Sequence, residues 1–158
     1  MYTLNISGDS IGNNGFMRFL IEQFDPYPIP PQTICFEITE TAAIANFERT
    51  RYFMSELKKI GCCFALDDFG SGLSSWAYLM NLPVDRLKID GAFVKNISHN
   101  LIAQALVEGF NCIARAMNLE TIAELVEDET ILEKLREMGV DYAQGYGLAH
   151  PVPINFNG

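Results

Sequence analysis

The sequence predicts an α/β protein built as an arc of a TIM-like (β/α) barrel, with about six of the eight βα units of a complete barrel. Short apolar segments alternate with longer amphipathic ones, which is the pattern of parallel strands joined by crossover helices. The apolar segments are hydrophobic on both faces, as expected for a sheet covered by helices. Each of them also ends in at least one polar side chain, and this feature separates a barrel from other α/β folds.

Each predicted element has a local reason. Short β-prone segments predict strands over residues 2–7, 33–39, 62–67, 86–90, 121–126 and 142–146. Longer segments with helical periodicity predict helices over residues 16–24, 46–60, 73–82, 101–117 and 129–138. The first helix ends at the proline-rich residues 25–31, the second at Gly61 and the third at Pro83, because these residues stop helices.

Polar residues at the strand ends favour a barrel over an open doubly wound sheet. All six predicted strands carry one or more of them: Asn5, Glu37, Asp67, Asp68, Lys88, Glu124 and Gln144. In a barrel, the carboxyl ends of all strands converge on one mouth, where active sites form. In an open sheet, only the strands beside the switch point can reach a common ligand.

The chain is predicted to be one partial barrel domain over residues 1–158. A complete barrel has eight strands and typically about 250 residues. The polar ends begin with the first strand, at Asn5, so we expect the two missing units to precede Met1. A six-stranded arc exposes two sheet edges that can pair with another chain, which predicts a dimer or higher oligomer.

Composition excludes several classes of protein. The 158 residues include 11 Lys plus Arg and 20 Asp plus Glu, for a net charge of −9, which argues against binding long nucleic acids. No apolar run approaches the length of a membrane span, and no secretory signal is visible. The four cysteines predict reduced, buried thiols in a cytoplasmic protein, with a redox pair at Cys62–Cys63 as the alternative.

The strand-end residues predict a divalent metal site. Asp67 and Asp68 precede a glycine-containing turn, where both side chains can face the same opening, and Glu37, Glu124 and Asn5 add further oxygen ligands. Hard oxygen ligands without His or Cys suit Mg²⁺ or Mn²⁺ and disfavour zinc.

Two such metal ions would stabilise in-line attack on a phosphodiester. Lys88 would place a positive charge near the reacting water or phosphate. The residues alone therefore predict metal-dependent hydrolysis or lyase chemistry on a phosphorylated or enolisable substrate. An enolising aldolase or decarboxylase barrel is an alternative at this point.

Six segments carry a resemblance to a known family, in the same order and with matching spacing. They are residues 5–7 (NIS), 36–41 (FEITET), 66–72 (LDDFGSG), 82–90 (LPVDRLKID), 123–127 (AELVE) and 144–146 (QGY). Together they resemble the EAL domain family, the cyclic di-GMP phosphodiesterases of bacteria, over essentially the whole chain. The resemblance implies a modified (β/α)₈ barrel that uses Mg²⁺ or Mn²⁺ to open cyclic di-GMP to linear pGpG.

The resemblance also implies metal-site roles. Asn5, Glu37 and Asp67 match metal ligands, with Asp67 as the bridge between two ions, and Asp68 matches a ligand of the second ion. Glu124 matches an active-site carboxylate near the metals.

Further roles follow from the same resemblance. Lys88 matches the lysine that contacts the attacking water, and Gln144 matches a residue of the same mouth. Glu40 matches the glutamate that holds the loop after Asp67–Asp68, a loop that takes part in dimerisation and activation. Asp90, on the strand of Lys88, is expected to support that lysine at the substrate side of the site.

The chain departs from the family pattern in three places. The Glu-Ala-Leu signature, which supplies a metal ligand, is absent and would belong to the portion expected before Met1. Leu125 stands where the family usually has glycine and is expected to crowd the backbone beside Glu124, and Ser71 replaces a common threonine.

These departures shape the functional expectation. The parent protein is expected to be an active phosphodiesterase with sensory or GGDEF domains, cytoplasmic or tethered to a membrane, while the fragment itself is expected to be inactive. A non-catalytic cyclic di-GMP receptor or an interaction module is the alternative.

Overall fold

The computed structural model describes residues 1–71 and 76–153 and contains one six-stranded sheet. All neighbouring strands are parallel. The strands are β1 (Tyr2–Asn5), β2 (Ile34–Thr39), β3 (Cys63–Phe69), β4 (Arg86–Ile89), β5 (Glu120–Ala123) and β6 (Tyr142–Ala143). The six predicted strands are therefore confirmed, although several of their bounds differ.

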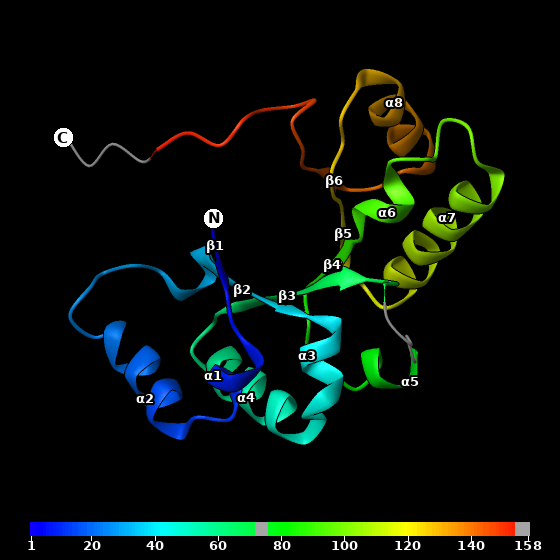
Figure 1. Cartoon of the computed structure of the whole chain (residues 1–158). Coiled ribbons are helices and arrows are strands. Elements are labelled where there is room, and N and C mark those ends of the chain that lie inside the picture. Colours follow the sequence, from blue (N-terminus) through cyan, green and yellow to red (C-terminus); the bar gives the residue numbers. More distant parts are fainter. Residues whose placement is uncertain (72–75, 154–158) are drawn as a thin grey trace.

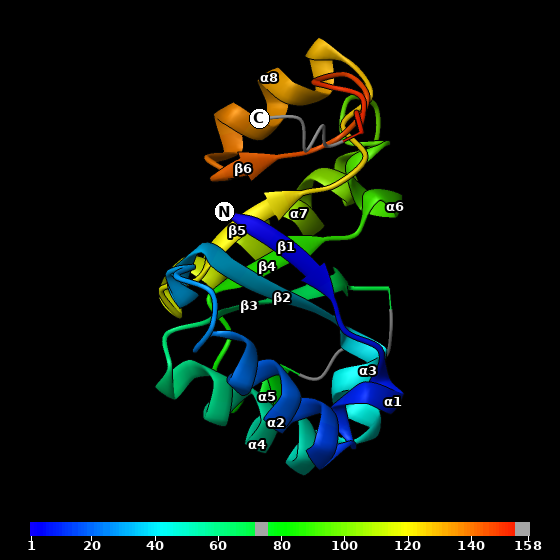
Figure 2. The ribbon, with the colours of Figure 1, turned by 90° about the vertical axis from the view of Figure 1, so that its left-hand side faces the viewer.

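The strand order settles the choice between the two predicted architectures. The strands lie in the order β1-β2-β3-β4-β5-β6, with no reversal along the sheet. A doubly wound sheet needs such a reversal at its switch point. The sheet curls into an arc with β1 and β6 at its two edges (Figures 1 and 2). This is the half-barrel that the sequence predicts.

The long helices cover the outer side of the arc. They are α2 (Asn14–Gln23), α4 (Phe47–Lys59), α7 (Leu101–Ala116) and α8 (Glu129–Met138), close to the predicted ranges. Buried apolar side chains from the strands pack against them, including Phe36 and Phe64, whose ring centroids are 5.6 Å apart. Figure 2 shows α2 and α4 beneath β2 and β3, with α8 beside β6. The helices thus leave the inner side of the sheet for polar residues.

Short helices that the sequence pattern does not predict follow three strands at the mouth. They are α1 (Gly8–Ile11), α3 (Glu40–Ala45) and α6 (Gly91–Val94). The side chains of Ser7, Thr39 and Asp90 accept a backbone N–H at their starts. Helices of four to six residues are too short to show periodicity, so only these capping residues could have indicated them.

Two further short elements complete the list. One is the 3₁₀ turn η1 (Pro31–Thr33) before β2. The other is α5 (Trp76–Leu79), which lies within the helix predicted over 73–82. Residues 73–75 of that prediction lie outside the described residues.

The cysteines only partly match the expectation of buried thiols. All four are free, and Cys35 and Cys62 are buried. Cys63 is partly exposed, and Cys112 is exposed on α7, so the prediction of four buried thiols is wrong for these two. The residues of α7 that face the core are Ala103, Val107, Asn111 and Ala114, which leaves Cys112 on the outer face.

None of the helices within the described residues combines the length and the hydropathy that a bilayer span requires.

Candidate functional site

The predicted polar residues meet at the mouth of the arc, around Lys88. The Lys88 ammonium lies 2.7 Å from Asp67 Oδ1, 2.9 Å from Glu124 Oε1 and 3.1 Å from Glu37 Oε2. These four side chains come from β2, β3, β4 and the end of β5, so one cluster draws on four successive strands. The Lys88 side chain is only 4% exposed.

The neighbouring carboxylates keep the side chain of Lys88 positively charged. Burial lowers the pKa of Lys88, but hydrogen bonds and charge interactions with Asp67 and Glu124 outweigh burial, and the net pKa is raised. The side chain therefore stays an ammonium at neutral pH. It can neutralise carboxylates and donate hydrogen bonds, but it cannot accept a proton as a general base.

A break in the strand register brings Asp67 and Asp68 to the same opening. Neighbouring residues of a regular strand point to opposite faces. Here the pairing of β3 with β4 shifts register between Leu66 and Phe69, and Asp68 adopts a left-handed conformation with φ of 54°. The sequence predicts that this strand ends at Asp67, but the strand continues to Phe69. Asp67 and Asp68 face the same opening, as predicted, because of this irregularity inside the strand.

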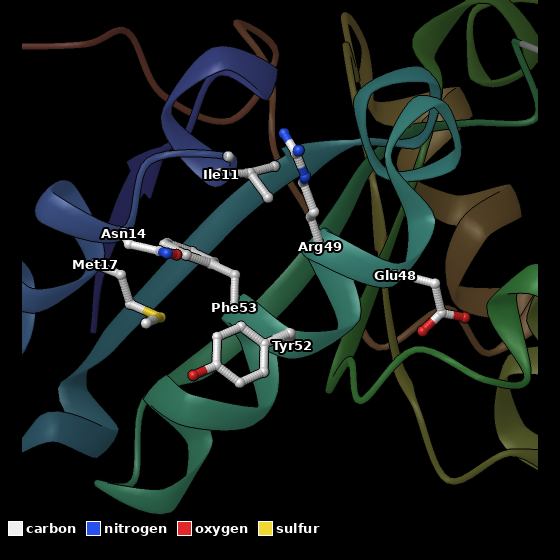
Figure 3. Close-up of a pocket in the computed structure, with 8 residues that line it drawn as sticks. Ile11, Asn14, Met17, Glu48, Arg49, Tyr52 and Phe53 are labelled. Atoms are coloured by element: carbon white, nitrogen blue, oxygen red, sulfur yellow. The ribbon is translucent and has the colours of Figure 1, made fainter.

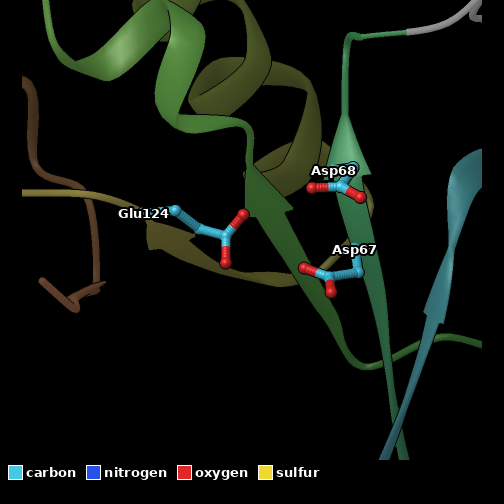
Figure 4. Close-up of side chains that lie close together, drawn as sticks. All are labelled: Asp67, Asp68 and Glu124. Carbon is cyan, nitrogen blue, oxygen red and sulfur yellow. The ribbon is translucent and has the colours of Figure 1, made fainter. Parts of the chain in front are cut away.

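Glu124 completes a cluster of three carboxylates. Glu124 follows β5 directly, and its carboxylate points toward Asp67 and Asp68 (Figure 4). One oxygen from each of the three residues lies within 4.8 Å of the others. Gln144 Nε2 donates a hydrogen bond of 2.9 Å to Glu124 Oε1, so the end of β6 joins the same site.

The pKa values of Glu124 and Asp68 are both raised, as expected where carboxylates crowd together. Burial raises the pKa of Glu124, and Asp67 and Asp68 raise it further, against the lowering effect of Lys88. The pKa of Asp68 is raised by burial, by Asp67 and by Asp90. A nearby cation stabilises the ionised form of carboxylates whose pKa values are raised. A cluster of oxygen ligands is suited to Mg²⁺ or Mn²⁺. The donor set thus fits the predicted metal.

The remaining predicted site residues lie around this cluster. Asn5 pairs in register with Glu37 across β1 and β2. Glu40 is buried, and its Oε2 accepts a hydrogen bond of 3.0 Å from the backbone N–H of Gly70, so it holds the loop after Asp67–Asp68. Asp90 caps α6 by accepting a 2.8 Å hydrogen bond from Ala92 N–H.

A second polar layer, which the sequence motifs do not indicate, lies beneath the cluster. Arg86 Nε donates to Glu120 Oε2 at 2.7 Å, and the Tyr142 hydroxyl donates to Glu120 Oε1 at 3.1 Å. The Arg86 guanidinium also lies 5.7 Å from the centroid of the Tyr142 ring. Arg86 is two residues before Lys88, so the period of two along β4 was the available signal that both face the barrel interior.

A separate pocket lies on the outer side of the arc. It has a volume of about 540 Å³ and is bordered by α1, α2 and α4, with Met17, Arg49 and Tyr52 among its lining residues (Figure 3). None of the predicted site residues lines it. The convergence of polar side chains at the mouth, rather than this pocket, marks the candidate site.

Comparisons with known proteins identify the family of this chain. The EAL domain model matches residues 1–151. Cyclic di-GMP phosphodiesterase PdeB of Shewanella oneidensis is 45% identical over 152 residues, covering 96% of this chain and 18% of that protein. Cyclic di-GMP phosphodiesterase PdeA of Borreliella burgdorferi is 42% identical over 154 residues, covering 98% and 23%. The chain thus spans about a fifth of the length of these relatives.

Solved structures share the fold. PaMucR phosphodiesterase in a c-di-GMP complex superposes with a TM-score of 0.90 at 30% identity, covering 96% of this chain and 61% of that one. The EAL domain of Mycobacterium smegmatis DcpA gives a TM-score of 0.88 at 33% identity, covering 95% and 67%. The arc therefore has the arrangement of the corresponding part of these domains.

Proposed function

This chain belongs to the EAL domain family, and from that premise we propose that the domain containing it is a metal-dependent phosphodiesterase that opens cyclic di-GMP to linear pGpG. One observation carries the proposal. The buried ammonium of Lys88 contacts the carboxylates of Glu37, Asp67 and Glu124. The carboxylates of Asp67 and Glu124 also form a cluster with that of Asp68. Few structural roles require so many charged groups at one buried point.

The metal-binding residues are proposed from the donor set. Asp67, Asp68, Glu37 and Asn5 would hold Mg²⁺ or Mn²⁺. Glu124 would support them from β5. When bound, the ions would lower the pKa of the attacking water and offset the charge of the phosphodiester.

The protein's own contribution is orientation and charge. Lys88 would supply positive charge beside the attacking water, because its raised pKa keeps it cationic. Glu40 would act indirectly, because its hydrogen bond to Gly70 fixes the start of the loop that follows Asp68. Glu124 would keep Lys88 in place through their 2.9 Å contact.

Substrate contacts are proposed at the rim of the mouth. Gln144 and Asp90 lie at the ends of β6 and β4, and both offer polar groups to a guanine or ribose. A net charge of −9 would repel a dinucleotide unless cations are bound at the mouth. The metal ions therefore also explain how this acidic domain would accept an anionic substrate.

The wider context is proposed from the family. We expect a cytoplasmic domain that forms a homodimer, joined in its parent protein to sensory or GGDEF domains. The Glu-Ala-Leu signature of the family does not occur in residues 1–158. The chain alone would then hydrolyse little or no cyclic di-GMP, because one metal would lose a ligand and catalytic charge stabilisation would fall.

The test is chromatography of cyclic di-GMP incubated with Mn²⁺ and the complete gene product that contains this chain. The proposal predicts pGpG from the wild type and none from Asp67→Asn. Binding of cyclic di-GMP without turnover, and without a need for Mn²⁺, would instead favour a receptor. Absence of both binding and turnover would leave an interaction module.

A further inference from the structure

Leu125 holds a backbone conformation that is unfavourable for its side chain. It follows Glu124 directly and has φ of 52°, in the left-handed region. In that region the Cβ of an L-residue approaches its own backbone, so glycine is the usual occupant. The Leu125 side chain is large and apolar, and the residue is 50% exposed at the mouth. A strained residue next to a candidate site residue calls for a physical reason.

Gly91 supplies the surface against which Leu125 rests. Gly91 is the buried first residue of α6, three positions after Lys88. A Cβ built on Gly91 would lie 2.4 Å from Leu125 Cδ1, 2.6 Å from Cγ and 2.7 Å from Cβ. These distances are too short for any side chain at position 91 while Leu125 keeps its place. The two residues therefore form a size-matched contact.

The contact joins the ends of two neighbouring strands. Gly91 follows β4, which carries Lys88, and Leu125 follows β5 and Glu124. Beside it, Glu124 N–H donates to Ile89 O at 3.2 Å. A shift of Leu125 would turn the peptide bond between residues 124 and 125 and move the carboxylate of Glu124.

We propose that Leu125 is a positioning residue, which by resting on Gly91 keeps the Glu124 carboxylate beside Lys88 and Asp67 for metal binding. The inference rests on the proposed function, because it assigns Glu124 to a metal site. It adds a residue that touches neither the metal nor the substrate. Packing on Gly91 holds Glu124 from the side opposite to its hydrogen bond with Gln144.

The first test separates positioning from general stability. Leu125→Gly should leave the melting temperature unchanged or raise it, because glycine accepts φ of 52° and the lost side chain is half exposed. The same variant should weaken Mn²⁺ binding, measured by calorimetric titration, by about tenfold, the lower end of what groups that orient metal ligands contribute.

Asn118 offers a matched control at the other end of the same strand. It also has a left-handed backbone, with φ of 58°, and lies just before β5, where it is exposed. Asn118→Gly should therefore relieve a similar conformation without changing the affinity for Mn²⁺.

A second pair of variants tests the contact itself. Gly91→Ala should lower both the melting temperature and the affinity for Mn²⁺, because the new Cβ displaces Leu125. Adding Leu125→Gly to Gly91→Ala should recover the melting temperature, because the space above position 91 is then open. No recovery in the double variant would contradict the size-matched contact.

The outcomes distinguish this inference from the proposed function. If the wild type binds Mn²⁺ and Leu125→Gly binds it equally well, the positioning role of Leu125 is overturned and the metal site is not. A parallel loss of melting temperature and affinity in Leu125→Gly would also overturn it, because that is the result of a purely structural role. Wild-type protein that does not bind Mn²⁺ at all would overturn the metal site, and the positioning role with it.

Discussion

Removing the Lys88 ammonium should unfold the domain at a markedly lower temperature. In Lys88→Met, Glu37, Asp67 and Glu124 lose their shared cation, although their side chains are only 8%, 14% and 14% exposed. Breaking a buried ion pair by removing one partner costs about 3–5 kcal/mol, because the other charge is left uncompensated. For a domain of this size, that loss lowers the melting temperature by about 6–20 °C.

The loss of stability in Lys88→Met should also depend on pH. Burial already raises the pKa of Glu124, and without the ammonium, which lowers it, the folded-state pKa of Glu124 should rise further above its unfolded value. Stability is then present below the unfolded pKa and is lost as the pH rises through the folded pKa. Lys88→Met should therefore lose more stability at pH 8 than at pH 5, each compared with wild type. Wild-type Lys88, whose pKa is raised, contributes stability that persists throughout this range.

The assay is thermal unfolding followed by circular dichroism in the presence of EDTA. Lys134→Met is a matched control, because Lys134 also contacts a carboxylate, Glu137, but both side chains are exposed. It should change the free energy of unfolding by less than about 1 kcal/mol. If Lys88→Met melts as close to wild type as Lys134→Met does, the reasoning about buried charge is refuted.

Two further changes probe the loop and the thiols. Gly70→Ala should destabilise the domain by about 2–4 kcal/mol in chemical denaturation, because its φ is 96° and the new Cβ would lie 2.8 Å from the Phe93 ring. In a thiol titration of native protein with a disulfide reagent at pH 8, exposed Cys112 should react first. Burial raises the pKa of Cys35 and Cys62 to about 11, so these two stay protonated and unreactive until unfolding.

Each of these predictions has a control in the chain. Gly109→Ala, on α7, places a Cβ in open space and should stabilise the protein slightly, by about 0.5–1 kcal/mol. Cys112→Ser should abolish the fast thiol reaction. Equal stability of the Gly70 and Gly109 variants would contradict the tight packing of the loop. Reaction of Cys35 or Cys62 in folded Cys112→Ser protein would contradict the burial of these two thiols.

The barrel and most of its mouth were predictable, because both depend on patterns that the sequence displays directly. Alternation of strand and helix signals fixed the parallel sheet, and polar residues at the strand ends located the mouth. Lys88 illustrates why this works. A charged residue inside an apolar strand must find partners of opposite charge, and the neighbouring strand ends supplied Glu37, Asp67 and Glu124.

What escaped prediction depends on contacts between residues that are distant in sequence. The register shift that turns Asp68 inward arises from pairing between β3 and β4, and no local signal announces it. The contact between Leu125 and Gly91 also has no local signal. These residues are 34 positions apart in the sequence and meet only when β4 and β5 pair. The exposure of Cys112 depends on which face of α7 packs against the sheet.

Calorimetric titration of this chain with Mn²⁺ tests most directly whether the strand ends form one divalent metal site. The account predicts that the wild type binds Mn²⁺ and that Asp67→Asn binds it at least about tenfold more weakly, while Lys134→Met matches the wild type. Equal binding by the wild type and Asp67→Asn, or no binding by either, would contradict the account.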